Sequence, residues 1–334
     1  MEPAISVIIP MYNAEKYIGD CLTSLANQTF KDFEVIVADD CSTDNSCAVV
    51  EKFFSVFGGR LKLGKLSRNS GYPGIPRNFA LEAARGKYVY FLDSDDLLID
   101  TALEKLYNTA ENFNADVVHA ESCFTFPDGA KKIDATPKSF QTGEFVTEPT
   151  LETFDLGQRV TDFARKRYVW WAWNKLIRRK LLSDNKITFP AIKTFEDFVF
   201  AFECLVAAKN YVRVPFVGYC YRVRDDSSSH KAGDGSDFME ILIKVVKSLD
   251  DFMNGKKFFI DNPQYKHMLT DFFMQERLKI FAESFLGGNY TIGEIYNFLY
   301  KEVFSRNPQD NVALTAYLFI AASLSKLNKN NLGG

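Results

Sequence analysis

The sequence lacks the cysteine spacing of a zinc-binding protein and the clustered positive charge of a nucleic-acid-binding protein. Its six cysteines show no C-x-x-C spacing, which indicates reduced structural thiols rather than a zinc site. Lys and Arg (40) nearly balance Asp and Glu (43), and there is no long basic run. This balance argues against a nucleic-acid partner, because binding a phosphate backbone depends on clustered positive charge. The reduced cysteines are typical of a cytoplasmic protein.

Long apolar runs are also missing. No charged leader with an apolar stretch precedes the strand-like run that begins at Ile5, so we expect no secretory signal. The late apolar segment 313–324 contains Thr315 and Ser323 and is shorter than the roughly 20 residues that a membrane-spanning helix needs. We therefore expect no integral membrane helix. A peripheral position on the inner face of the membrane stays open.

The first half of the sequence alternates short β-branched runs with segments of helical period. This alternation predicts βαβ units and a mainly parallel, Rossmann-like α/β sheet flanked by helices. The expected strands cover 5–9, 33–38, 61–66, 88–92 and 116–120, and the expected helices cover 15–27, 44–57, 75–84 and 101–112. Breaking residues between about 124 and 157 suggest a hairpin and an excursion, and 178–224 reads as helix, turn, helix and two short strands. The remainder after Gly235 has helical spacing.

Polar residues follow four of the predicted strands. In an open parallel sheet the ligand crevice lies at the carboxyl ends of the strands, so these residues are expected to meet at one edge. For any single cluster, turn formation or helix capping is the better explanation. Four clusters at one edge favour a binding site. They are residues 10–13, 39–44, 67–71 and 93–96.

The last of these clusters contains three carboxylates, Asp93, Asp95 and Asp96, within four residues. Carboxylates this close repel one another unless a cation compensates them. Mg²⁺ or Mn²⁺ suits such oxygen ligands and commonly completes its shell with water and a diphosphate. The cluster therefore predicts a metal-bound nucleotide diphosphate. A solvated acidic loop that caps the helix over 101–112 is the alternative.

Several motifs occur together in a specific order. They are SVIIPMYN at 6–13, VADDCSTD at 37–44, PRN at 76–78 and FLDSDD at 91–96. In this combination they resemble the family 2 glycosyltransferases of the GT-A fold, over roughly residues 4–230. The resemblance implies an inverting glycosyltransferase that uses a UDP-sugar donor. The sequence departs from the family at Cys41, where glycine is usual, and at an insert over 72–76 that carries two prolines.

The resemblance also implies roles for individual residues. Pro10 and Tyr12 would flank the nucleoside, Asp40 would accept a hydrogen bond from uracil, and Asp93 and Asp95 would form the D-x-D pair. Asp95 is expected to bind Mn²⁺ or Mg²⁺ directly. The remaining donor contacts expected are Asn13, Asn69, Arg77 and Ser94, and weaker candidates for phosphate or metal contact are Arg222, Arg224 and His230.

The segment TFEDF at 194–198 resembles the family's E-D motif, in which the second carboxylate is the catalytic base. That residue is Asp197, and Glu196 is the next candidate. An inverting displacement needs one base for the acceptor hydroxyl and one electrophile for the departing diphosphate. Acidic residues that favour a helix N-terminus are the alternative explanation for this pair.

The expected organisation follows from the resemblance. Residues 1–234 would form the GT-A catalytic domain, with a donor half at about 1–120 and an acceptor half at about 121–234, and 235–334 a helical region. An apolar face in that region leaves open a homo-oligomer contact or a membrane contact. Of Trp170, Trp171 and Trp173 we expect two in the core and one beside a sugar, and the sequence does not say which.

The predicted function is transfer of a sugar to a hydroxyl of a glycan or lipid-linked glycan, in cell-surface polysaccharide synthesis. One alternative is a nucleotidyltransferase that makes nucleotide sugars. That class would carry a Gly-rich basic loop after the first strand, where this chain has Pro10 to Asn13. The other is a silent nucleotide- or glycan-binding subunit, against which the retained carboxylates argue.

Overall fold

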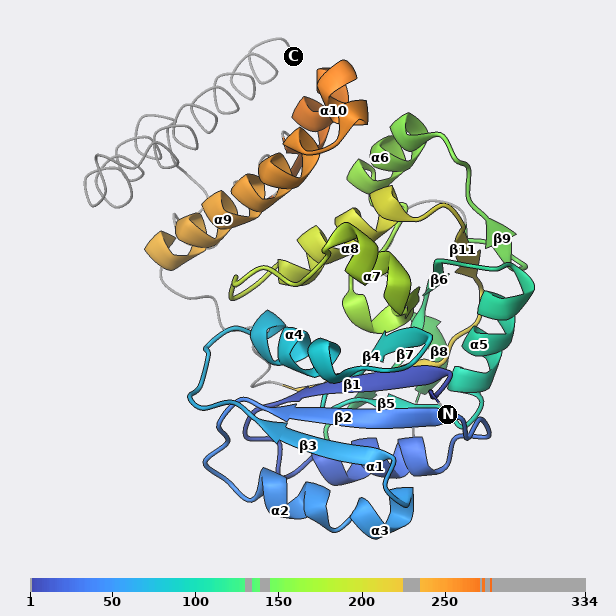
Figure 1. The fold of residues 1–334 in the computed structure, drawn as a ribbon, viewed down its shortest axis with the longest axis vertical. Helices are drawn as coiled ribbons and strands as arrows, with labels where there is room; N and C mark the ends of the chain where they lie inside the picture. Colours follow the sequence, from blue (N-terminus) through green and yellow to red (C-terminus); the bar gives the residue numbers. More distant parts are fainter. Residues whose placement is uncertain are drawn as a thin grey trace. The chain divides into compact units, whose positions relative to one another are not determined.

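The structure is a computed structural model that describes residues 2–129, 134–138, 145–224, 235–270, 272–273 and 277. The chain divides into two compact units, Met1–Ser227 and Ser228–Gly334. The first unit is built on two sheets with flanking helices (Figure 1). This arrangement confirms the predicted α/β class.

The larger sheet has eight strands in the order β3-β2-β1-β4-β10-β6-β11-β9. Strands β3, β2, β1 and β4 are parallel, as are β6 and β11, while β10 runs antiparallel between β4 and β6. The strands are β1 (Ile5–Met11), β2 (Phe33–Asp39), β3 (Leu61–Lys65), β4 (Tyr88–Phe91), β6 (Val117–Ala120), β9 (Thr150–Leu151), β10 (Lys175–Arg178) and β11 (Tyr211–Val214).

Helices cover both faces of this sheet, which is why β1 and β2 are apolar along nearly their whole length. Val7 and Ile9 pack with Leu22 of α1 (Ile18–Ala26) and Leu106 of α5 (Ala102–Asn112). Helix α4 (Gly74–Ala83) lies across β1 and β2 on the other face (Figure 1). The other helices of this unit are α2 (Ser46–Glu51), α3 (Phe54–Phe57), α6 (Leu156–Ala164), α7 (Arg179–Asn185) and α8 (Glu196–Ala207).

Aromatic packing fixes α8 on the sheet. Phe200 of α8 stacks on Phe189 with ring centroids 3.9 Å apart, and both rings meet Phe91 of β4 edge-on at 5.5 and 5.0 Å. These buried contacts hold the first turn of α8 close to the end of β4. The carboxylate cluster predicted at residues 93–96, called the acidic motif below, follows β4 directly.

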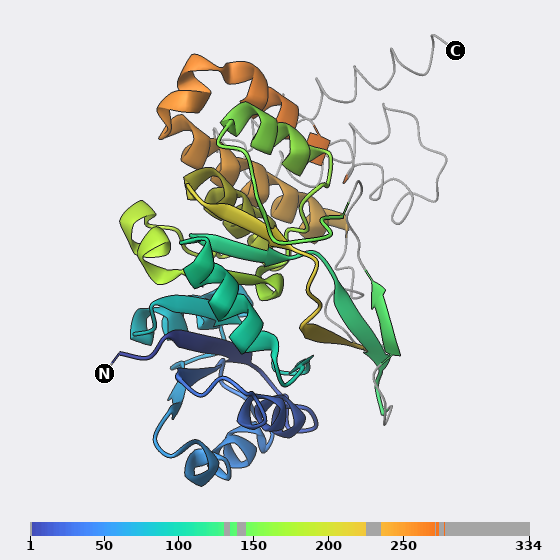
Figure 2. The same ribbon diagram turned by 90° about the vertical axis from the view of Figure 1, so that its right-hand side faces the viewer.

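The smaller sheet has the order β5-β12-β7-β8. Figure 2 shows it beside the larger sheet. Its strands are β5 (Leu97–Leu98), β7 (Cys123–Pro127), β8 (Asp134–Lys138) and β12 (Tyr219–Val223). Because β5 follows the acidic motif and pairs with β12, this sheet brings residues 219–224 to that motif.

Two expectations about elements need correction. The helix predicted over 44–57 is two short helices, α2 and α3, and the Asp44 carboxylate accepts the backbone N–H of Ser46 at the start of α2. Strand β10 lies where no strand is predicted, directly before the helix expected to begin at Arg178. Its residues Lys175–Arg178 form a central strand, because its two neighbours in the sheet come from much earlier in the sequence.

The second unit is helical where the structure describes it. Helix α9 (Gly235–Asn254) buries Leu242, Val245 and Leu249 at helical spacing, and α10 (Lys257–Asp261) follows. Lys266 pairs with Asp250 of α9 at 2.5 Å, so the segment after α10 folds back on α9. Among the described residues no helix combines the length and the apolar character that crossing a membrane requires.

Candidate active site

The first two strand ends meet through their loops. Met11 and Asp39 are register partners at the ends of β1 and β2. Asn13 adopts a φ of +48°, and its amide oxygen accepts the backbone N–H of Thr43 at 2.8 Å. This contact gives Asn13 a role in joining the two loops. Tyr12, one residue earlier, is 51% exposed and so is available to a ligand.

Asp40 is buried behind this edge. Its carboxylate accepts hydrogen bonds from the backbone N–H and the hydroxyl of Ser70, both at 2.8 Å, and Asn69 donates to the Asp40 carbonyl at 2.9 Å. Asp40 and Asn69, both expected at the nucleotide, therefore lie together. Cys41 follows in the left-handed region with φ +63°, which explains why glycine is usual at this position.

The carboxylates of the acidic motif have different environments. Asp93 pairs with Arg77 at 2.8 Å and Asp95 with Arg224 at 2.7 Å. Asp96 is buried and accepts the Tyr219 hydroxyl at 2.5 Å and the backbone N–H of Arg222 at 2.7 Å. Thus Asp96 anchors the motif to β12, while Asp93 and Asp95 are the two that face cationic side chains. Ser94 between them is half-buried.

Burial and mutual repulsion destabilise the charged forms of the carboxylates in this cluster. Burial raises the pKa of Asp95, and the charge of Asp93 raises it further, while Arg224 lowers it. Burial also raises the pKa of Asp96 well above its usual value, and the charges of Asp95 and Asp93 add to this shift. A cation at this place would relieve the repulsion.

Arg77 joins the acidic motif to α8. Besides its bond to Asp93, it donates to Glu196 at 2.6 Å. The resemblance placed Arg77 at the nucleotide, and the structure shows its two terminal nitrogens bound to protein carboxylates. Arg77 is therefore the link between the D-x-D and E-D motifs.

Helix α8 begins at Glu196, after Phe195 with a φ of +68°. A left-handed bulky residue is strained, and such strain is frequent at functional sites. Glu196 is buried and Asp197 is half-buried. Burial raises the pKa of Asp197, and the neighbouring charge of Glu196 raises it further, while Arg77 lowers it. A carboxylate with a raised pKa is suited to accept a proton.

The two arginines of β12 differ in their partners. Arg222 is buried and donates to the Asp95 carbonyl at 2.8 Å and to Asp20 at 3.1 Å. Protein oxygens thus engage Arg222, which was expected at the diphosphate. Arg224 contacts the Asp95 carboxylate itself and lies over the Tyr17 ring at 4.8 Å. His230 lies outside the described residues.

Residues 170–173, the tryptophan segment, contact residues next to both the E-D motif and the acidic motif. Trp173 is buried and stacks between Trp171 at 4.6 Å and Tyr219 at 4.1 Å. Trp170 contacts Phe198, the neighbour of Asp197, edge-on at 5.6 Å. Trp173 is thus a core residue, whereas Trp170 and Trp171 are half-buried.

Two residues of this region have contacts that no sequence motif indicated. The Tyr219 hydroxyl contacts Asp96 from 123 positions away, and the buried Lys175 holds the tryptophan segment through its ammonium group. A buried lysine at the start of a β-strand has no local pattern that reveals it. Only the pairing of β10 with β6 shows its place.

The oxygen donors at this edge fit a divalent cation that keeps few protein ligands. Asp93 and Asp95 offer the hard carboxylate oxygens that Mg²⁺ or Mn²⁺ prefers, and each already lies beside one arginine, Arg77 or Arg224. Within the part of the chain that the structure describes, no three His, Cys, Asp or Glu side chains converge as a complete metal cage. The remaining ligands would then come from the nucleotide and water.

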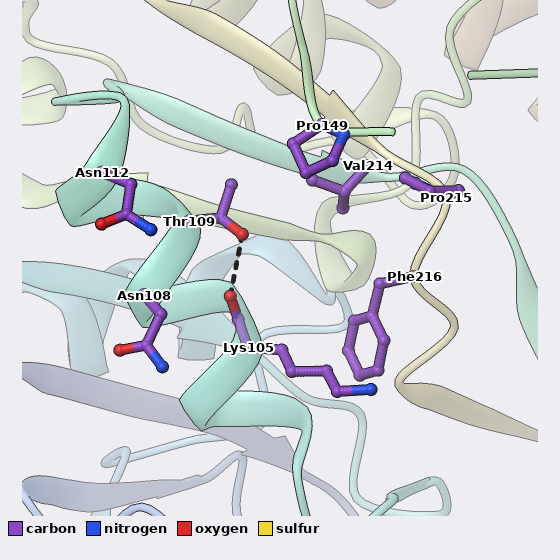
Figure 3. Close-up of a pocket in the computed structure, with 8 residues that line it drawn as sticks. All are labelled: Lys105, Asn108, Thr109, Asn112, Pro149, Val214, Pro215 and Phe216. Atoms are coloured by element: carbon purple, nitrogen blue, oxygen red, sulfur yellow. Dashed lines mark hydrogen bonds between the residues drawn. The ribbon is translucent and has the colours of Figure 1, made fainter. Parts of the chain in front are cut away.

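A hollow of about 420 Å³ lies elsewhere in this unit (Figure 3). It is bounded by one face of α5 and by the segment after β11. The lining residues are Lys105, Asn108, Thr109, Asn112, Pro149, Val214, Pro215 and Phe216. It shares no residue with the acidic motif or α8 and is therefore distinct from the candidate active site.

Comparison with known proteins agrees with this geometry. The family described as Glycosyl transferase family 2 matches residues 6–182, more than half of the chain. Poly(ribitol-phosphate) beta-N-acetylglucosaminyltransferase TarP of Staphylococcus aureus is 28% identical, over 98% of this chain and 96% of its own. Poly(ribitol-phosphate) beta-glucosyltransferase of Bacillus spizizenii is 34% identical over 74% of this chain but 37% of its own length, so this chain spans well under half of that relative.

A solved structure shows the same fold. The crystal structure of S. aureus TarS 1-349 in complex with UDP-GlcNAc superposes with a TM-score of 0.67, covering 98% of this chain and 92% of that chain at 24% identity. The fold of this chain is therefore the GT-A fold that the motifs predicted.

Proposed function

Because the chain belongs to glycosyl transferase family 2, we propose that it transfers a sugar from a UDP-sugar to an acceptor hydroxyl with inversion of the anomeric carbon. The observation that carries this proposal is the Arg77 bridge. Arg77 contacts Asp93 at 2.8 Å and Glu196 at 2.6 Å, so the D-x-D and E-D motifs lie at one sheet edge. The first is the proposed diphosphate-binding motif, and the second carries the proposed base. An inverting transferase needs both in one place.

Asp197 is the proposed base. It removes the proton of the acceptor hydroxyl while that oxygen attacks the anomeric carbon and the diphosphate leaves. Half-buried at the first turn of α8, Asp197 is accessible to an acceptor, whereas Glu196 is buried and bound to Arg77. Glu196 therefore positions Arg77, and Asp197 accepts the proton.

The proposed nucleoside site lies at the carboxyl ends of β1 and β2. Asp40 would accept a hydrogen bond from the uracil N–H, Asn69 would support that contact, and Pro10 and Tyr12 would flank the base. The exposed Tyr12 ring offers the stacking surface. Ser70, which donates twice to Asp40, holds the carboxylate in place.

Asp95 and Asp93 are the proposed metal-binding residues. When bound, Mn²⁺ or Mg²⁺ supplies positive charge that stabilises the departing diphosphate. Arg224 is the proposed second cation for the diphosphate, since its guanidinium already contacts Asp95. Arg222 fixes the backbone of the motif through the Asp95 carbonyl.

For the acceptor we propose a hydroxyl of a cell-surface glycan or polyol phosphate polymer. The similarity to two poly(ribitol-phosphate) glycosyltransferases supports this class. Membrane contact and self-association of the second unit stay predictions, as does the boundary near Gly235.

The test is a thermal-shift screen of UDP-, GDP-, CDP- and dTDP-sugars with and without Mn²⁺, followed by transfer assays on ribitol phosphate polymer and on lipid-linked glycan. We expect UDP-sugars with Mn²⁺ to raise the melting temperature selectively, by mass action on the folded state. Product NMR should show an α-linked donor converted to a β-linked product. Retention of the anomeric configuration, or equal stabilisation by all four nucleotides, would contradict the proposal.

A further inference from the structure

Lys175 is a buried cation behind the candidate active site. It begins β10, faces His119 of β6 in the register of the sheet, and is 1% exposed. A buried charge is costly unless hydrogen bonds and an opposite charge compensate it. Such a residue in the middle of a sheet therefore needs an explanation.

Three oxygen atoms surround the Lys175 ammonium. Nζ lies 2.7 Å from the carbonyl oxygens of Val169 and Trp171 and 2.7 Å from Oδ1 of Asn174. The Asn174 amide nitrogen donates to the Ala120 carbonyl, which fixes the amide so that its oxygen faces the lysine. Carbonyl oxygens only accept, and a neutral amine has two N–H groups for three acceptors. The geometry therefore favours the charged, three-donor form.

Helix α8 contacts residues Ala172–Asn174, directly before Lys175, and Asp197 on that helix supplies the opposite charge that acts on the ammonium. Burial lowers the pKa of Lys175 to about 7, while the charge of Asp197, and then that of Cys204, raises it. In return Lys175 lowers the pKa of Asp197, which burial and the charges of Glu196 and Asp93 raise. Three hydrogen bonds to acceptors act in the same direction as Asp197, so we take the ammonium as the form present near neutral pH.

Arg77 is the other cation that acts on Asp197. Its terminal nitrogens are hydrogen-bonded to Asp93 and Glu196, so those two carboxylates compensate much of the guanidinium charge. Among the described residues, the Lys175 ammonium donates to two carbonyl oxygens and one amide oxygen, all of them uncharged. Its field is therefore available to Asp197.

The same ammonium holds the segment that contacts both motifs. Trp170 packs on Phe198 beside Asp197, and Trp173 stacks on Tyr219, which binds Asp96. Fixing the carbonyls of Val169 and Trp171 fixes the backbone on both sides of Trp170. The lysine thus couples the strand to two parts of the site.

We propose that Lys175 is a positioning residue for the proposed transfer, supplying the positive charge that compensates Asp197 and holding the tryptophan segment in place. This rests on the proposed function, in which Asp197 is the base. The charges that shift the pKa of Asp197 come from Glu196 on α8, Arg77 on α4, Asp93 after β4 and Lys175 on β10. The pKa of Lys175 is shifted by Asp197 and Cys204 on α8. Lys175 in turn lowers the pKa of His119 on β6.

The test compares Lys175→Met with Arg159→Met in the full chain. Arg159 is a matched control, because it is buried and its guanidinium, within the described part of the chain, donates to backbone carbonyls such as those of Leu205 and Ala208. We expect the acid limb of kcat/KM to move up by about one pH unit in Lys175→Met and to stay in place in Arg159→Met. Binding of UDP with Mn²⁺ should be retained in both, which shows that they fold.

Carboxyl ¹³C NMR of aspartate-labelled protein, with Asp197→Asn to assign the signal, reads the same coupling without turnover. The Asp197 titration should move upward in Lys175→Met whether or not the protein transfers sugar, so failure of the proposed function is told apart from failure of this inference. An unmoved titration in folded Lys175→Met, or an equal shift in Arg159→Met, overturns the proposal.

Asn174→Asp provides a second variant if Lys175→Met does not fold. It keeps the lysine and an oxygen acceptor but places a carboxylate against the ammonium, which neutralises its field at Asp197. The Asp197 titration should again rise. No change in this variant, with the fold intact by UDP binding, also overturns the proposal.

Discussion

Asp197 and Glu196 are adjacent carboxylates with different surroundings. Glu196 is bound to Arg77, whereas Asp197 is half-buried and, within the described residues, no cationic side chain is hydrogen-bonded to it. We expect Asp197→Asn to lower kcat by about 10²- to 10⁴-fold with little change in donor affinity, because Asn cannot accept the proton. Steady-state kinetics and calorimetry with UDP and Mn²⁺ measure the two effects.

Glu196→Gln is the matched variant. It removes the charge that Arg77 binds, so it should weaken donor binding and stability as well as turnover. If Asp197→Asn retains full activity while Glu196→Gln loses only kcat, the two roles are reversed.

Asp40 combines a proposed contact to uracil with a contact to the protein. Asp40→Ala should lower UDP affinity by about 1.5 to 3 kcal/mol and reduce the preference for UDP over GDP. Ser70→Ala keeps the carboxylate and should cost less, although it loses one of the two bonds to Asp40. Competition binding with both nucleotides checks this, and an unchanged UDP to GDP ratio in Asp40→Ala would place base recognition elsewhere.

His119 links the buried polar groups of the sheet to pH. Burial lowers its pKa well below the usual value, and the charges of Lys175 and Arg213 lower it further. As pH falls through the unfolded value of about 6.5, the unfolded chain takes up a proton that the folded protein does not. The free energy of unfolding should therefore decrease by about 1.4 kcal/mol per pH unit for this group until the folded pKa is reached.

His119→Asn removes the titrating imidazole and should therefore flatten this slope. The fold should survive, because Asn can still accept from the Tyr211 hydroxyl, which lies 3.2 Å from Nδ1 of His119. Urea unfolding between pH 7 and pH 5 measures the slope. A parallel loss of stability in wild type and His119→Asn would remove His119 from the acid response.

At the scale of elements, β12 holds the acidic motif in place. Tyr219→Phe removes the hydroxyl that donates to the buried Asp96 and should lower the free energy of unfolding by about 1 to 3 kcal/mol. Since Asp96 adjoins Asp95, metal-dependent UDP binding should weaken as well. Tyr221→Phe on the same strand is the control for loss of a hydroxyl. Equal unfolding energies of the two variants would show that the Asp96 contact contributes little.

The sequence predicted the elements that depend on local patterns. The buried runs of β1 and β2 and the apolar period of α1 and α5 gave the core of the sheet within a few residues. Strand β10 was missed because its pairing partners Tyr90 and Val118 lie far away in the chain. A four-residue strand carries no periodicity that distinguishes it from a helix start.

The candidate site shows the same division. Asp93, Asp95, Glu196 and Asp197 were found by motif, and the structure brings their two segments together. The contacts of Arg77 and Arg222 to protein carboxyl and carbonyl groups could not be predicted, because they depend on how α4, α8 and β12 meet. Residue type identified the charged groups, and tertiary packing decided their partners.

At the scale of the whole molecule, nucleotide binding should depend on metal. Diphosphate beside Asp93 and Asp95 adds negative charge to carboxylates that already lie close together. We expect UDP affinity to fall by at least about tenfold in EDTA relative to Mn²⁺, because Arg77 and Arg224 are already paired with Asp93 and Asp95 and leave the diphosphate charge uncompensated. Calorimetry in both buffers measures this. Equal affinities would rule out a metal-bridged diphosphate, and Asp95→Asn should reproduce the EDTA result in the presence of Mn²⁺.

The position of β10 in the sheet has a consequence for biosynthesis. Strands β4 and β6 leave the ribosome well before Lys175–Arg178, the strand that must enter between them. Until then the nascent sheet has two unpaired inner edges, which are sites of misassociation. The same insertion delivers Lys175 to its buried place. A chain arrested before that insertion is therefore both exposed to aggregation and without its positioning lysine, and the site is complete only after α8 and β12 have followed.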